Sequence, residues 1–138
     1  MHHNVQVGDL DRLTVVRGRL LGRLARRHDR RVTMVVAGAG FGKTTLVRQM
    51  LHDPVPDGSA TDIVVSLRAP APDAVGFLQL LAEGVSGAPV ATADTDRLVD
   101  LIWARSPTHV VIVVDDVHLL DDEASQALHD VHDRLPLN

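Results

Sequence analysis

The sequence predicts an α/β fold in which helices flank a parallel β-sheet. Three short runs rich in β-branched residues have the composition of strands, and they occupy residues 32–37, 62–67 and 109–114. None of these runs alternates polar with apolar side chains, so each strand is expected to be buried on both faces. Helical patterns fill the stretches between and after the runs, an order that favours parallel βαβ units with right-handed crossovers.

Four helices are expected, at residues 43–52, 73–85, 94–105 and 121–135. Asp73, Asp94 and Asp121 stand at the starts of the last three helices, where a carboxylate accepts backbone N–H groups and complements the helix dipole. The only tryptophan, Trp103, falls on the 94–105 helix and is expected in the core.

The chain has 138 residues, of which 45% are apolar, so it has the size and the core-forming capacity of one domain. It contains no cysteine, which excludes a disulfide framework and a thiolate metal site. The sequence shows neither a signal peptide nor an apolar run of the roughly eighteen residues that span a membrane. We therefore expect one cytoplasmic domain over residues 1–138, with a flexible N-terminus at residues 1–10.

Lys43, the only lysine of the chain, closes a glycine-rich stretch between the first predicted strand and the next helix. Residues 37–44 read A-G-A-G-F-G-K-T, which matches the phosphate-binding P-loop pattern G-x-x-x-x-G-K-[ST] except for alanine at its first position. Such a loop presents backbone N–H groups to a phosphate, and its glycines are expected to adopt positive φ. The predicted nucleotide-binding residues are Gly38, Ala39, Gly40, Phe41, Gly42, Lys43, Thr44 and Thr45.

The residues at the end of this loop each suit one part of a nucleotide. The Lys43 ammonium would contact the β- and γ-phosphates as a catalytic group, the Thr44 hydroxyl would bind Mg²⁺, and Thr45 would lie beside the α-phosphate. A glycine-rich turn without a ligand is the simpler alternative. However, a buried strand before the loop and a helix after it are the context that a P-loop requires.

Asp115 and Asp116 directly follow the third predicted strand, where P-loop proteins carry the acid called Walker B. Asp115 would hold Mg²⁺ through water, and Asp116 would orient or deprotonate the attacking water as a catalytic group. A capping role for Asp116 is the alternative. His118 follows closely, and a local hydrogen bond is a simpler role for it than contact with the γ-phosphate.

Charge is distributed unevenly, although the net charge is only −4. Residues 1–52 carry ten basic and three acidic groups, whereas residues 53–138 carry four basic and fifteen acidic groups. Seven arginines lie between positions 17 and 31, mostly on the helical face opposite the leucines. A solvated face is the first interpretation, and contact with a partner domain, a nucleotide or nucleic acid stays open.

Three segments, RGRLLGRL from residue 17, VAGAGFGKTTL from residue 36 and VVIVVDDVHLL from residue 110, resemble the nucleotide-binding domain of MalT-like regulators of the LuxR family. These are the signal-transduction ATPases called STAND, within the P-loop NTPases related to AAA+. The resemblance covers residues 11 to 138 and implies a three-layer P-loop NTPase fold that binds Mg-ATP. In relatives the segment matching residues 16–20 lies near the adenine, which implies nucleotide contacts for Arg17 and Leu20.

The resemblance also implies that the domain is truncated after the Walker B strand and its following helix. Family members continue with a strand bearing a sensor residue, helical domains and a helix-turn-helix, so no DNA-binding element is expected in this chain. The missing strand usually lies between the first and third predicted strands. Those two strands must then pair directly or leave a gap with an exposed edge, which invites self-association or a partner protein that completes the sheet.

Two functions of different classes follow from these observations. The first is the ATPase switch module of a signal-responsive transcription regulator, which hydrolyses ATP to ADP slowly. The second is a nucleotide-binding module without turnover, either a fragment or a protein that needs a partner. A small P-loop kinase is the weakest alternative, because residues 117–138 contain one arginine instead of an arginine-rich lid. ATP is preferred to GTP on the resemblance and because no Asn-Lys-x-Asp motif occurs.

Overall fold

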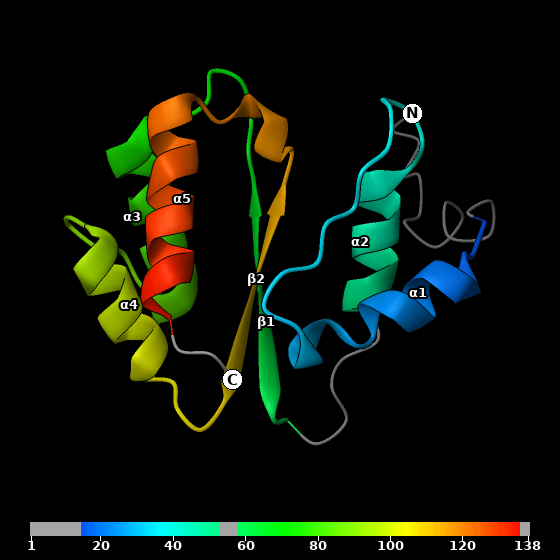
Figure 1. Ribbon diagram of the computed structural model, residues 1–138, viewed down its shortest axis with the longest axis horizontal. Coiled ribbons are helices and arrows are strands. Elements are labelled where there is room, and N and C mark those ends of the chain that lie inside the picture. Colours follow the sequence, from blue (N-terminus) through cyan, green and yellow to red (C-terminus); the bar gives the residue numbers. More distant parts are fainter. Residues whose placement is uncertain (1–14, 53–57, 136–138) are drawn as a thin grey trace, which may run out of the picture.

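A two-stranded parallel sheet forms the middle layer of the protein, seen in a computed structural model that describes residues 15–52 and 58–135. Strand β1 (Ala60–Ser66) pairs with β2 (His109–Asp115) along its whole length. Helices α3, α4 and α5 lie on one side of the sheet, and α1 and α2 lie on the other (Figure 1). The predicted α/β class with a parallel sheet is confirmed. The N-terminus predicted to be flexible, residues 1–10, lies outside the described residues.

All four predicted helices are present within a few residues of their expected bounds. The helices of the described residues are α1 (Gly18–Leu24), α2 (Lys43–Leu51), α3 (Ala74–Ser86), α4 (Thr95–Trp103) and α5 (Asp122–Arg134), with 3-10 turns η3 (Arg27–Asp29) and η4 (Val117–Leu119). Asp73, Asp94 and Asp121 each accept a hydrogen bond of 2.8 Å from the N–H three residues ahead. This bond satisfies a donor that the start of a helix leaves unpaired, so the predicted caps are confirmed.

The main core lies between β1 and the helices α3, α4 and α5. Its fully buried side chains include Phe77, Leu81 and Val85 of α3 and Leu98 of α4. Trp103, the last residue of α4, is 53% exposed, so its predicted place in the core is wrong. The core side of α4 is taken by other apolar residues of the helix, Leu98, Leu101 and Ile102.

Burial along β1 alternates. Ile63 and Val65 face the main core, whereas Val64 between them is 40% exposed. The expectation that each strand is buried on both faces is therefore wrong for β1. A second, smaller cluster formed by Leu24, Leu46 and Met50 joins α1 to α2, and it packs against Val113 of β2.

The first predicted strand does not form. Residues 32–37 (light blue to cyan in Figure 1) belong to no sheet, and no backbone hydrogen bond joins them to the described strands. The side chains of Met34 and Val36 are 77% and 84% exposed. A strand needs a hydrogen-bonded neighbour about 4.8 Å away, and the described residues supply none. The chain thus leaves a gap instead of pairing this segment with β2.

Two arginines attach the N-terminal half to the rest of the protein. The buried Arg27 guanidinium donates through Nε to Oδ1 of Asp62 on β1 at 2.8 Å, and through Nη1 to the Leu24 carbonyl at 3.1 Å. Arg31 donates to the carbonyls of His132 and Leu135 at the end of α5. The start of the 32–37 segment is therefore fixed to both β1 and α5.

Candidate functional site

The glycine-rich loop turns sharply into α2. Gly40 and Gly42 have φ of 78° and 77°, in the left-handed region that other residues rarely adopt. Gly38 does not have positive φ, so that expectation is wrong for it. A Cβ at Gly38 would lie 3.2 Å from Cε2 of Phe41, so this glycine gives room to the Phe41 ring.

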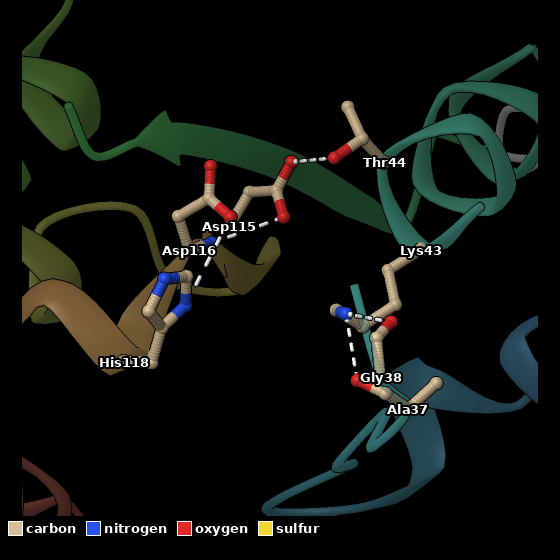
Figure 2. A network of polar contacts seen from close by, with 7 residues as sticks. All are labelled: Ala37, Gly38, Lys43, Thr44, Asp115, Asp116 and His118. Carbon is tan, nitrogen blue, oxygen red and sulfur yellow. Dashed lines mark hydrogen bonds and ion pairs between the residues drawn. The ribbon is translucent and has the colours of Figure 1, made fainter. Parts of the chain in front are cut away.

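Lys43 is the first residue of α2, and its side chain folds back over the loop. Its Nζ donates to the carbonyls of Ala37 at 2.7 Å and Gly38 at 2.9 Å (Figure 2). The positive end of the α2 dipole lies at the same place. The loop therefore gathers an ammonium group and a helix N-terminus, the two features that attract a phosphate.

Thr44 and Asp115 meet across the site (Figure 2). The Thr44 Oγ1 donates to Oδ2 of Asp115 at 2.8 Å, and Oδ1 of Asp115 accepts from the Asp116 N–H at 3.0 Å. Asp115 is the last residue of β2 and is 9% exposed. A hydroxyl and a carboxylate held side by side are hard oxygen donors of the kind Mg²⁺ prefers, so this pair fits that ion.

Asp116 directly follows the end of β2. Its backbone is left-handed, with φ of 59° and ψ of 34°, a conformation that aspartate tolerates better than most residues. One of its carboxylate oxygens lies 4.0 Å from Nδ1 of His118 on η4 (Figure 2). The carboxylates of the two adjacent acids thus have different side-chain partners, Thr44 for Asp115 and His118 for Asp116, and the Asp116 side chain is partly exposed.

A cavity of about 690 Å³ opens beside the loop, between α1, the 32–37 segment and α2. Its apolar lining includes Leu20, Phe41 and the apolar side chains of residues 32–37. Its cationic lining consists of Arg17, Arg23, Arg26, Arg30 and Lys43, and no described acidic residue contributes to it. Part of the basic face predicted to be solvated therefore lines a hollow suited to an anionic ligand.

A family model described as an AAA domain matches residues 26–137. The chain belongs to this AAA domain family. The matched range includes the glycine-rich loop and both acids at the end of β2, which makes the site a P-loop module for nucleotide. AAA P-loop domains generally bind ATP with Mg²⁺. Searches of the curated proteins and of the solved structures found no match.

In this AAA domain, the remaining predicted nucleotide contacts lie around the loop. Ala39 and Thr45 are exposed, one within the loop and one in the first turn of α2. Leu20 is 38% exposed and lines the cavity.

No helix within residues 15–52 and 58–135 combines the length and apolar character needed to cross a membrane.

Arg17 contacts the loop itself. Its Nη1 donates to the Phe41 carbonyl at 2.7 Å, and its guanidinium lies 3.6 to 4.0 Å from the position of a Cβ on Gly42. The sequence carries no local signal for this contact, because it joins residues 24 positions apart through the packing of α1 on α2. The same applies to the Arg27 contact with Asp62.

Proposed function

We propose that this AAA domain binds Mg-ATP and serves as the nucleotide switch of a signal-responsive transcription regulator, hydrolysing ATP slowly. The observation that supports it best is the hydrogen bond that Asp115 accepts from Thr44, the residue that directly follows Lys43. This bond brings two oxygens that could bind a metal, one from Thr44 and one from Asp115, next to the phosphate loop. The regulator role rests on the resemblance to MalT-like proteins, whereas the cytoplasmic location stays an expectation from the sequence.

Each residue has a defined task in this proposal. The loop N–H groups and Lys43 hold the phosphates, while Thr44 and Asp115 hold Mg²⁺, which neutralises phosphate charge when it is bound. Asp116 orients the attacking water or takes its proton. Leu20, in the cavity lining, gives the adenine an apolar contact.

A binding module without turnover is the second candidate, and the unpaired 32–37 segment favours it. This segment leads directly into the phosphate loop, so the loop lacks the support of a neighbouring strand on that side. In this version a second copy or a partner protein supplies a strand between residues 32–37 and β2. Turnover would then require that partner.

Lys43→Ala tests nucleotide binding, with Arg48→Ala as the control. Both changes remove one positive charge from α2, but Arg48 is exposed on a later turn of the helix. Lys43→Ala should weaken Mg-ATP binding about 100-fold, since losing a charged contact of this kind costs about 3 kcal/mol. Arg48→Ala should bind like wild type in titration calorimetry.

The same preparations separate the two candidates. Phosphate release by wild type that Lys43→Ala abolishes supports the ATPase. Mg-ATP binding by wild type without phosphate release supports the binding module. Undiminished binding by Lys43→Ala would refute the assignment of the loop.

A further inference from the structure

Arg17 connects α1 to the phosphate loop. Its backbone carbonyl accepts the N–H groups of Leu20 and Leu21, which start α1, while its side chain reaches the Phe41 carbonyl. Phe41 stands between two left-handed glycines, at the sharpest part of the loop. One residue therefore both begins a helix and holds a carbonyl of the loop.

The Arg17 guanidinium has donors to spare. It carries five N–H groups, and within the described residues its side chain makes one hydrogen bond and no ion pair with a carboxylate. Its positive charge is thus available to an anion. Arg19, two residues further on, is also exposed but makes no hydrogen bond or ion pair with the loop among the described residues.

Arg17 and Lys43 occupy comparable positions on the loop. Lys43 rests on the carbonyls at its start, and Arg17 rests on the carbonyl of Phe41 near its end. Both side chains line the same cavity. A cation bound to a loop carbonyl holds that carbonyl away from the phosphate position, which favours the inward N–H groups that such a loop needs.

We propose that Arg17 is a second phosphate-directed cation of the site, which shifts its free N–H groups onto the phosphates of a bound nucleotide. A guanidinium suits this role because its planar fork binds phosphate oxygens in pairs. The inference rests on the proposed nucleotide binding. It replaces the adenine contact that the family resemblance implies for Arg17 with a contact to phosphate.

The contact also makes α1 responsive to the ligand. Leu24 of α1 packs against Leu46 and Met50 of α2, and Gln49 of α2 donates to the Val15 carbonyl at 3.3 Å. Movement of Arg17 toward phosphate therefore pulls on a helix that is already packed against α2. Phosphate binding should reduce the mobility of residues 18–24.

Titration calorimetry with ATP, tripolyphosphate and adenosine tests the assignment. Arg17→Ala should lower the affinity for ATP and for tripolyphosphate by the same factor, about tenfold or more, and leave the affinity for adenosine unchanged. Arg19→Ala, which removes a like charge from the first turn of α1, should bind all three ligands like wild type. Thermal melting of both variants confirms that they are folded.

Hydrogen exchange provides a second measurement that needs no turnover. In the protein without ligand, the amide hydrogens of residues 38–45 should exchange faster in Arg17→Ala than in Arg19→Ala. Tripolyphosphate should slow exchange in residues 18–24 of wild type, and this protection should be lost in Arg17→Ala.

The outcomes are distinct. If Arg17→Ala loses affinity for ATP and adenosine but not for tripolyphosphate, Arg17 contacts the adenine and the inference is overturned. Wild-type behaviour of Arg17→Ala in both measurements would overturn it while leaving nucleotide binding intact. If wild type binds neither ATP nor tripolyphosphate, the proposed function fails, and this inference fails with it.

Discussion

The Thr44 hydroxyl donates to the Asp115 carboxylate at 2.8 Å, although the two residues are 71 positions apart. The bond joins the first turn of α2 to the end of β2, so the phosphate loop and the acidic strand end have a fixed separation. Their contact is the structural basis of the predictions about the site.

Asp115→Asn should weaken the effect of Mg²⁺ on nucleotide affinity. The amide keeps the size of the side chain but loses the charge that a divalent cation requires. In calorimetry with Mg²⁺ and with a chelator, the gain in ATP affinity from Mg²⁺ should fall about tenfold, while metal-free affinity stays unchanged. Asp100→Asn, an exposed site on α4, serves as the control. An undiminished Mg²⁺ effect in Asp115→Asn would remove this residue from the metal site.

Asp116→Asn should stop turnover and leave binding intact. Asparagine accepts left-handed backbone geometry about as well as aspartate does, so the change isolates the loss of the carboxylate. Loss of a general base lowers a rate by about 10² to 10⁴, measurable as phosphate release at saturating Mg-ATP. Asp122→Asn on α5 is the matched control. Wild-type phosphate release from Asp116→Asn would reduce Asp116 to a structural role.

Arg27→Met should destabilise the fold strongly, because it leaves the Asp62 carboxylate, only 13% exposed, without this partner. Breaking a buried pair on one side costs about 3–5 kcal/mol, whereas replacing both partners with apolar residues is often neutral. Urea unfolding of Arg27→Met, Asp62→Leu and the double variant measures this coupling. Arg26→Ala, from an exposed pair, should cost less than about 1 kcal/mol. Additive losses in the double variant would show that the pair is not coupled.

His28 should make stability depend on pH. Burial lowers the pKa of His28 below its usual 6.5, and the charge of Arg27 lowers it further against the opposing effect of Asp62 and Asp29. Both ring nitrogens are buried without a hydrogen-bond partner among the described residues. Below pH 6.5 the unfolded chain binds a proton that the folded protein resists, so stability is present above this pH and falls below it.

The measurement is the midpoint of thermal unfolding between pH 8 and pH 5, for wild type and His28→Leu. The difference between the two proteins removes the contribution of other histidines. The wild-type midpoint should fall more steeply below pH 6.5 than that of His28→Leu. Parallel curves would show that His28 is not responsible.

Features set by neighbouring residues could be predicted from the sequence. The aspartate caps depend on one side chain and an N–H three residues ahead, so Asp73, Asp94 and Asp121 identified the starts of three helices correctly. The P-loop ATPase class was predictable for the same reason, because the loop pattern is contiguous, whereas the narrower resemblance to MalT-like regulators stays a prediction. The assigned roles of Lys43, Asp115 and Asp116 remain predictions.

Features that depend on distant partners could not be predicted. Residues 32–37 have the composition of a buried strand, but a strand exists only with a hydrogen-bonded neighbour. Trp103 illustrates the same limit, since a helical pattern does not say which of several apolar residues the core will take. The contacts of Arg17 with Phe41 and of Arg27 with Asp62 arise from packing between helices and strands.

The unpaired 32–37 segment can couple two binding events, that of a nucleotide at the loop and that of a strand along the segment. Ala37 is the last residue of this segment, and its carbonyl accepts a hydrogen bond from the Lys43 ammonium. If phosphate binding orders this segment, the measured affinity already includes that ordering cost. Any strand that pairs with residues 32–37 removes the cost and raises the affinity for nucleotide. By the same coupling free energy, bound nucleotide raises the affinity for the strand by an equal factor.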